Sequence, residues 1–447
     1  MTEKDCYKYV LAPDVFYRKT PAGDVVLYQT TKQNVFLLGG QVYDLLDALK
    51  ENRYASQIGG EPLAAYWHTH NSAVDTEMVS QMLEMGWIAA PTILEERKHT
   101  LEGELKMGQY RPVNALSDVQ FELTFRCNEH CRHCYCPREN EIAKELTTAE
   151  VKGVLDELKE MQVMCVTFTG GDLFMRTDAF EIMEYAYRLG FAINIFTNGT
   201  LLKDADFFRL KALYPRSVHF SIYNYIPEKH DAFTQLPGSF ERTVSAIKKC
   251  RLLGIPTNIK VSLVEENYDD IEGICELAED LGTTIQISMQ ITPKNDGSME
   301  PTALRVNNAV RYAEVMRKVD RHILLVCAGE TLNDSDKLEN GPVCGTGVYS
   351  LNINPYGDVF ACNALLIPCG NIRSSSIQQI WEGSEELKRI RSFRMNQLKG
   401  CEGCAMKRQC DFCPGSAMQE TGDPLMRYSE ACTLAKAKII KQKGDSV

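Results

Sequence analysis

Three cysteines lie close together in the segment Cys127-Asn-Glu-His-Cys131-Arg-His-Cys134. Thiolates are ligands for zinc and for iron–sulfur clusters. Three thiolates are one short of the full ligand set of a [4Fe–4S] cluster, so a cluster held here would keep one iron open for a small ligand. A zinc site is the alternative, although such a site usually pairs one Cys-x2-Cys with a second pair or with two histidines.

A second group of cysteines gathers in the C-terminal region. Its members are Cys344, Cys362, Cys369, Cys401, Cys404, Cys410, Cys413 and Cys432. The predicted elements around them are short and rich in Gly and Pro, so we expect bound metal to hold the shape of this region. A zinc ribbon built on Cys401, Cys404, Cys410 and Cys413 is one possible form of that metal site.

The cysteine content, the charge and the absence of long apolar runs limit the class of protein. The chain has 447 residues and 17 cysteines, with a net charge of −11. Its first residues are charged rather than apolar, and no run approaches the ~20 apolar residues that span a bilayer. We therefore expect a cytoplasmic protein with no membrane partner, in which reducing surroundings favour metal or cluster ligation over disulfides. The negative charge disfavours nucleic acid as a partner, because phosphates would be repelled.

Strands and helices alternate in the middle of the chain. Six strand-like runs are predicted at 119–125, 163–168, 191–196, 217–222, 257–263 and 284–290. The first helix between them begins with the capping box Thr147-Thr-Ala-Glu150, and its apolar stripe comprises Val151, Val154, Leu155 and Leu158. Repeated β–α units predict an α/β fold with a parallel sheet and outer helices, which fits a partial (β/α)6 TIM-type barrel. The active site of such a barrel lies at the C-terminal ends of its strands.

Small and polar residues follow the predicted barrel strands. The cysteine loop comes directly after the first strand, and Gly170, Gly171 and Asp172 follow the second. Asn198 follows the third strand, and Ser221 lies near the end of the fourth. Two consecutive glycines let the backbone approach a ligand closely. Each of these residues also suits an ordinary turn, so their position after the strands is what makes them candidates for a site.

The sequence divides into four predicted parts. Residues 1–91 form a small α+β unit, 92–116 a charged linker, 117–320 the barrel and 321–447 the cysteine-rich domain. Within the first part, strands are predicted at 6–11, 24–29 and 87–89, and amphipathic helices at 40–50 and 75–85.

The cysteine loop after the first barrel strand resembles the signature of the radical SAM superfamily. That resemblance implies a [4Fe–4S] cluster on Cys127, Cys131 and Cys134, whose open iron binds the amino and carboxylate groups of S-adenosylmethionine (SAM). One electron then splits SAM and gives a 5′-deoxyadenosyl radical, which abstracts a hydrogen from the substrate. The family usually has an aromatic residue before the third cysteine, where this sequence has His133.

The same resemblance implies roles for the residues that follow the later strands. Gly170, Gly171 and Asp172 would receive the SAM amino group, although the family more often has Glu at the position of Asp172. Asn198 and Ser221 would contact the ribose and carboxylate of SAM.

The C-terminal cysteines resemble the SPASM extension of radical SAM enzymes that mature peptides and proteins, which houses two auxiliary iron–sulfur clusters. The family pattern gives Cys401, Cys404, Cys410 and Cys432 to one cluster, and Cys344, Cys362 and Cys413 to the other. Many relatives have a further cysteine where this sequence has Ser350. Either Cys369 then supplies the fourth ligand, or that cluster stays open for a substrate thiolate.

The element order of residues 1–91 resembles the winged-helix-like RiPP recognition element, to which the leader of a precursor peptide adds as an extra strand. The helix at 75–85 has no Lys or Arg, which disfavours a DNA-binding winged helix. The combined resemblance is to a radical SAM/SPASM peptide maturase of the sactipeptide or ranthipeptide type. It implies a thioether from a substrate Cys to a carbon of another residue, a precursor peptide as partner, and a reductase or flavodoxin-type electron donor.

Other functions remain open at this point. The radical could instead serve a carbon–carbon crosslink, an epimerisation, a decarboxylation or a sulfatase-type formylglycine maturation. The non-enzyme alternative is a peptide-binding protein that contains structural zinc.

Overall fold

The computed structural model describes residues 10–20, 22–30, 32, 34–47, 49–50, 76–89, 115–137, 144–320 and 341–444. The chain forms two compact units, Met1–Pro112 with Gly190–Ala192 and Val113–Leu189 with Ile193–Val447. Most of the predicted linker at 92–116 and the start of the predicted C-terminal domain at 321–340 lie outside the described residues. Within the described part of the chain, none of the helices has the length and apolar character of a membrane span.

The N-terminal unit contains a three-stranded antiparallel sheet. Its strands are β2 (Val15–Lys19), β3 (Val25–Gln29) and β4 (Asn34–Leu38), in that order, and a separate pair joins β1 (Val10–Leu11) to β5 (Ile88–Ala89). Beside them lie η1 (Gly40–Val42), which opens the helix predicted at 40–50, and α4 (Thr76–Glu84). Strands β2 and β4 were not predicted, because β2 buries nearly every residue and β4 leaves nearly every residue half-exposed, so neither shows clear alternation.

The second unit is built on six strands of a parallel sheet. They are β6 (Asp118–Glu122), β7 (Cys165–Thr169), β8 (Ala192–Thr197), β9 (Ser217–Ser221), β10 (Thr257–Ser262) and β11 (Thr284–Ser288). These strands are neighbours in chain order, and the pairings β6–β7, β8–β9, β9–β10 and β10–β11 are parallel. All six lie where the sequence predicts a strand, although β6 ends at Glu122 rather than at 125. The predicted α/β fold is confirmed.

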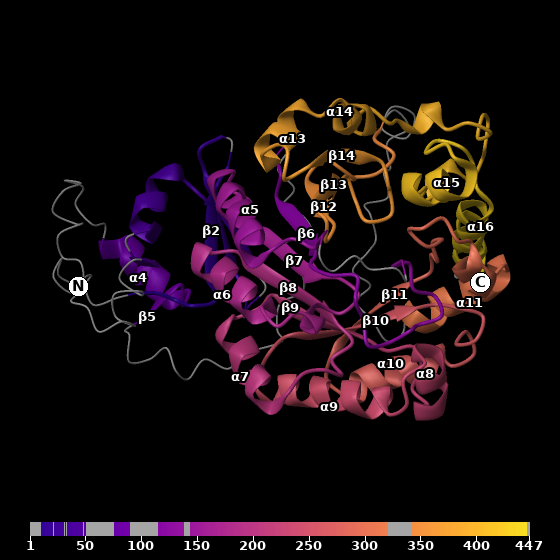
Figure 1. Ribbon diagram of the computed structural model, residues 1–447, viewed down its shortest axis with the longest axis horizontal. Helices are drawn as coiled ribbons and strands as arrows, with labels where there is room; N and C mark the ends of the chain where they lie inside the picture. The colour runs from indigo at the N-terminus through magenta and orange to yellow at the C-terminus, as the bar shows by residue number, and fades with distance from the viewer. Residues whose placement is uncertain are drawn as a thin grey trace. The chain divides into compact units, whose positions relative to one another are not determined.

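Helices accompany the strands. They are α5 (Thr148–Glu160), α6 (Ala179–Leu189), α7 (Asp204–Ala212), α8 (Pro227–Thr234), α9 (Ser239–Leu252), α10 (Ile271–Asp280) and α11 (Ala309–Asp320), with the short η5 (Leu173–Met175) and η6 (Glu300–Leu304). Figure 1 shows α5, α6, α7, α9 and α10 arranged along the strands. The predicted capping box is present, since Glu150 N donates to Thr147 Oγ1 at 3.2 Å and Thr147 N donates to Glu150 Oε2 at 2.7 Å. The predicted apolar stripe of α5 is buried.

Alternate residues of the barrel strands have different surroundings. In β9, Val218 and Phe220 are fully buried, whereas His219 and Ser221 are half-buried. In β10, Ile259 is fully buried and Lys260 is half-buried. Because successive side chains of a strand point to opposite faces, the apolar face packs against helices and the opposite face carries polar groups. The sheet therefore has a polar inner face on which chemistry can be placed.

The C-terminal region adds strands to the same sheet. Strand β12 (Ser350–Ile353) pairs in parallel with β6, and β13 (Asp358–Phe360) and β14 (Pro368–Asn371) continue antiparallel to give nine strands. The remaining elements are α13 (Ile377–Gly383), α14 (Glu385–Arg391), η7 (Met395–Gln397), η8 (Lys407–Gln409), α15 (Pro414–Thr421) and α16 (Ser429–Gly444). Helix α16 packs beside α11, as Figure 1 shows. The C-terminal region is thus continuous with the barrel sheet.

Candidate active site

The cysteine loop lies between β6 and the C-terminal end of α8. His130 N donates to Thr234 O at 2.9 Å, and Arg132 N donates to Phe233 O at 3.2 Å, so the middle of the loop is fixed to α8. The thiols of Cys127, Cys131 and Cys134 are free and half-buried.

The three thiols are close enough to influence one another. Burial raises the pKa of the Cys127 thiol to about 12, and the charges of Asp172, Glu129 and Cys134 add to this rise. Burial likewise raises the pKa of Cys131 well above its usual range, with further contributions from Glu129, Cys134 and Cys127. Such a concentration of thiols and carboxylates favours a bound cation, which would stabilise the thiolate form of each cysteine.

The glycine loop after β7 packs directly against the start of the cysteine loop. Gly171 N donates to Thr124 O at 2.7 Å, and Asp172 N donates to Arg126 O at 2.8 Å. A Cβ atom at Gly170 would lie 2.3 Å from Thr124 O, and one at Gly171 would lie 2.3 Å from Arg126 O. The two glycines are therefore required by the contact between the two loops, a reason different from the close approach of a ligand that the sequence suggested.

Asp172 connects the glycine loop to the end of β8. Its carboxylate is fully buried and accepts hydrogen bonds from Phe174 N at 2.9 Å, Thr197 Oγ1 at 2.7 Å and Asn198 N at 2.9 Å. Burial raises the pKa of this carboxyl group, and the three hydrogen bonds oppose that rise. In the described residues Asp172 therefore holds the turn after β8 in place, and its contact with SAM stays a prediction.

Asn198 and Ser221 lie at the ends of the next two strands. The Asn198 amide Nδ2 is 3.8 Å from Cys127 Sγ and donates to Asn128 Oδ1 at 2.9 Å, so the structure brings Asn198 to the cysteine loop. Ser221 is half-buried. Burial raises the pKa of Tyr223 well above its usual range, and the side chain of Ser221 opposes that rise. The charge of Cys131 acts on the same Tyr223.

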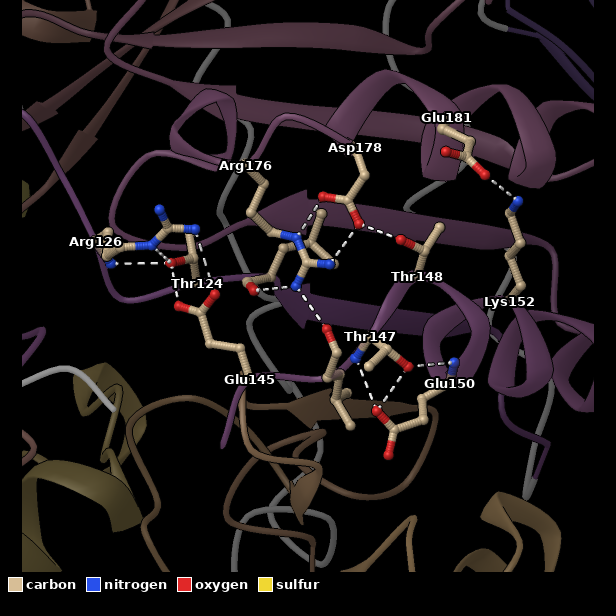
Figure 2. Close-up of polar contacts among 12 residues, drawn as sticks. Thr124, Arg126, Glu145, Thr147, Thr148, Glu150, Lys152, Arg176, Asp178 and Glu181 are labelled. Carbon is tan, nitrogen blue, oxygen red and sulfur yellow. Dashed lines mark hydrogen bonds and ion pairs between the residues drawn. The ribbon is translucent and has the colours of Figure 1, made fainter. Parts of the chain in front are cut away.

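A buried arginine braces the junction between β6 and the cysteine loop, and sequence patterns gave no signal for it. Arg176 Nη1 donates to Leu123 O at 3.1 Å and to Leu146 O at 2.8 Å, and its Nη2 is 2.6 Å from Asp178 Oδ2 (Figure 2). The Thr124 hydroxyl donates to a Glu145 carboxylate oxygen in the same region, as Figure 2 also shows. These contacts fix the strand end from which the cysteine loop begins.

The C-terminal thiols fall into two sets. Burial raises the pKa of Cys410 to about 12, and Cys401, Cys432 and Cys404 add to the rise, so these four thiols form one set.

In the second set, burial raises the pKa of Cys362 to about 11, with contributions from Cys413 and Cys344. Cys369 is buried, and its Sγ lies 3.5 Å from Ile367 O. Burial raises its pKa to about 11, and the backbone of Ala361, which directly precedes Cys362, opposes that rise. The charged side chains that act most on the pKa of Cys369 are those of Glu386, Arg391 and Arg389.

These thiols suit iron–sulfur clusters. In the described part of the chain, no three His, Cys, Asp or Glu side chains lie close enough together to hold a single metal ion. A cluster does not require such a group, because each thiolate binds a different iron. Sets of three, three and four neighbouring thiols provide the donor chemistry that such clusters take.

Comparison with known proteins decides the family. Residues 121–278 match the Radical SAM superfamily, and residues 344–405 match the iron–sulfur cluster-binding domain SPASM. The AdoMet-dependent heme synthase of Methanosarcina barkeri is 30% identical over 337 residues, which cover 70% of this chain and 95% of that protein. The chain belongs to the radical SAM superfamily. As a radical SAM enzyme with a SPASM region, it uses a [4Fe–4S] cluster, SAM and auxiliary iron–sulfur clusters, as predicted.

Two other proteins resemble this radical SAM enzyme over nearly its whole length. The antilisterial bacteriocin subtilosin biosynthesis protein AlbA of Bacillus subtilis is 25% identical over 440 residues, 93% of each chain. The crystal structure of Streptococcus suis SuiB bound to the precursor peptide SuiA has a TM-score of 0.61 at 15% identity. That similarity covers 95% of this chain and 99% of SuiB, and it shows the shared fold.

Proposed function

We propose that this radical SAM enzyme modifies a ribosomally made precursor peptide by joining a peptide Cys sulfur to a carbon of another residue. The observation that carries the thioether chemistry is the set of Cys344, Cys362 and Cys413: Cys413 and Cys344 are among the groups that act most on the pKa of Cys362, and Cys369 is not. A cluster with three protein thiolates keeps one iron open, and a substrate thiolate is a ligand that such an iron accepts.

The N-terminal unit supports a peptide substrate. The match to the heme synthase leaves 30% of this chain uncovered, whereas the match to AlbA spans 93% of it and so includes most of that unit. Strand β4 is an edge of the three-stranded sheet, is half-exposed along its length, and carries Leu37 at 61% exposure. A leader peptide can add to such an edge as a further strand, with main-chain hydrogen bonds giving affinity.

The residues of this chain take the following proposed roles. Cys127, Cys131 and Cys134 hold the cluster that binds SAM. Asp172 and Asn198, with the two glycines beside Asp172, shape the loops against which SAM binds. When bound, the cluster supplies the electron that generates a carbon radical from SAM, and an external donor of flavodoxin or reductase type replenishes that electron.

The auxiliary clusters have separate proposed ligands. Cys401, Cys404, Cys410 and Cys432 hold one completely, and Cys344, Cys362 and Cys413 hold the other.

The test uses the full chain loaded with iron and sulfide under anaerobic conditions, with SAM, a reductant and a Cys-containing precursor peptide encoded beside it. We expect 5′-deoxyadenosine, and a peptide that is lighter by two hydrogen atoms and has one fewer thiol that can be alkylated. The Cys127→Ala/Cys131→Ala/Cys134→Ala variant is the control and makes neither product. A lighter peptide with every thiol still free indicates a carbon–carbon crosslink, and an unaltered peptide mass contradicts the thioether.

A further inference from the structure

A buried carboxylate lies beside the cysteine loop but outside the three thiol sets. Glu122 is the last residue of β6 and is 3% exposed. Its Oε1 accepts a hydrogen bond from Tyr135 Oη at 2.9 Å, and its Oε2 accepts one from Asn352 Nδ2 at 2.9 Å. Tyr135 directly follows Cys134, and Asn352 is in β12, so this carboxylate joins the barrel to the C-terminal region.

Both partners of Glu122 are neutral. Among the described residues, no cation forms an ion pair with its carboxylate, and burial raises its pKa against the two hydrogen bonds. Burying a carboxylate without a cation is unfavourable, and it increases the proton affinity of that group. A buried base of this kind is typical of a position where a proton is taken up.

The surroundings of Glu122 still have free acceptor positions. A carboxylate offers about four lone-pair sites, of which the two hydrogen bonds use two. Asn352 is 2% exposed, and its Oδ1 has no hydrogen-bond partner among the described residues. An unpartnered buried acceptor beside a carboxylate with open lone pairs favours a ligand that brings hydrogen-bond donors. Peptide N–H and thiol S–H groups are such donors.

The hydrogen-bond network of Glu122, Tyr135 and Asn352 lies near segments that carry thiols of two different sets. Burial raises the pKa of Tyr135 well above its usual range, and the side chain of Asn363, which directly follows Cys362, opposes that rise. Tyr135 therefore lies near the loop that carries Cys362 as well as in the loop that carries Cys134. A peptide that reacts between the two proposed clusters would lie next to Glu122.

We propose that Glu122 accepts the proton that the substrate peptide loses, and that Asn352 Oδ1 binds an N–H group of that peptide. The inference rests on the proposed function. In the thioether case the S–H bond of the peptide breaks, an O–H bond forms on Glu122, and the electron pair stays on sulfur. The hydrogen atom on the carbon of the other residue passes to the 5′-deoxyadenosyl radical, which becomes 5′-deoxyadenosine. Bonding of the sulfur electron pair to that carbon leaves one electron over, which an auxiliary iron–sulfur cluster would accept as the oxidant. Tyr135 is a positioning residue that holds the carboxylate.

Glu122→Gln tests the base without removing its contacts. The glutamine oxygen still accepts from Tyr135, and Asn352 can turn its amide so that Oδ1 accepts from the new N–H group. Because Asn352 Oδ1 is then no longer free for the peptide, the variant is compared with the wild type at saturating peptide. At saturating peptide, we expect 5′-deoxyadenosine at the wild-type rate and about a hundredfold less modified peptide per 5′-deoxyadenosine, the usual contribution of a general base. The electron paramagnetic resonance spectrum of the reduced, SAM-bound protein should match that of the wild type.

Two further variants complete the experiment. Asp118→Asn removes a half-buried carboxylate from the same strand, and we expect it to keep the wild-type ratio of modified peptide to 5′-deoxyadenosine. Asn352→Ala should weaken binding of the peptide about fivefold, the loss of one neutral hydrogen bond, measured by fluorescence anisotropy.

The inference is overturned if Glu122→Gln keeps the wild-type ratio of modified peptide to 5′-deoxyadenosine, or if its electron paramagnetic resonance spectrum differs from that of the wild type. A wild-type chain that makes 5′-deoxyadenosine but leaves the peptide unaltered contradicts the proposed function instead.

Discussion

The carboxylate of Asp172 accepts a hydrogen bond from the hydroxyl of Thr197 at 2.7 Å, so the loop after β7 is connected to the end of β8. Both residues are buried, and the same carboxylate also binds the backbone N–H groups of Phe174 and Asn198. Because the backbone N–H of Asp172 also donates to Arg126 O, this one residue connects the ends of three strands.

Replacing Asp172 should therefore destabilise the second unit, which contains the parallel sheet. Asp172→Ala leaves two buried donors and one half-buried donor without an acceptor, and we expect the free energy of unfolding to fall by about 3 kcal/mol. Chemical unfolding of the cluster-free protein, followed by circular dichroism, measures this change. Asp269→Ala, at an exposed position, is the control and should stay within about 0.5 kcal/mol of the wild type. Equal effects of the two variants would contradict the role of Asp172.

Gly171→Ala should separate the glycine loop from the cysteine loop. The added Cβ would lie 2.3 Å from Arg126 O, a backbone atom that cannot move without shifting the start of the cysteine loop. We expect less iron per chain after reconstitution and weaker SAM binding, measured by iron analysis and equilibrium dialysis. Gly153→Ala is a matched control, because a Cβ there meets no atom within 4 Å and α5 gains about 1 kcal/mol of helix propensity. Full iron loading of Gly171→Ala would show that the glycine loop and the cysteine loop can separate without loss of cluster binding.

Arg176 should stabilise the strand end before the cysteine loop. Arg176→Ala leaves two buried carbonyl groups without a donor and Asp178 without its cation, and we expect a loss of about 3 kcal/mol in the free energy of unfolding. Lys249→Ala removes a surface ion pair with Asp204 and should change stability by less than about 1 kcal/mol. Thermal unfolding of the two variants side by side provides the comparison. Similar melting temperatures would contradict the stabilising role of Arg176.

His230 should make the cluster-free protein sensitive to mild acid. Burial lowers the pKa of this fully buried imidazole to about 4, and its Nδ1 accepts from Tyr223 N at 3.2 Å. Between pH ~6.5 and ~4 the unfolded chain binds a proton that the folded chain does not, so stability falls as the pH is lowered, by up to about 3 kcal/mol. His230→Asn keeps an acceptor for Tyr223 and should flatten this part of the stability–pH curve. An unchanged slope would mean that other groups cause the acid sensitivity.

The thiol sets predict which cysteines bind iron. Cys413→Ser should remove one auxiliary cluster, lowering the iron and sulfide content, whereas Cys369→Ser should leave both contents and the electron paramagnetic resonance spectrum unchanged. Cys369 is then a buried apolar residue in this region. Loss of a cluster in Cys369→Ser would identify it as the fourth ligand and remove the basis for an open iron.

Local patterns predicted the barrel because its strands and helices bury residues at regular spacing. The six strands and the capping box at Thr147 and Glu150 were found in this way. The cysteine spacing identified the loops that carry the thiols. Patterns of this kind do not show which distant segments pair, so the parallel pairing of β12 with β6 was not predicted.

The sequence also did not predict that particular charged residues are buried. Arg176 and Glu122 are charged side chains inside the protein, and a sequence alone places such residues at the surface. The approach of a ligand to the glycines before Asp172 stays a prediction, and the structure adds that these glycines pack against another loop. Their partners come from segments about 45 residues earlier in the chain, and only tertiary structure brings these together.

The pairing of β12 with β6 also sets the order in which the protein can fold. Until residues 350–353 have been synthesised, one side of Asp118–Glu122 is an open strand edge with unpaired backbone groups. The strand that leads to the cysteine loop is thus among the first of the barrel to leave the ribosome and among the last to be completed. A nascent chain that ends before β12 is therefore exposed to edge-to-edge association.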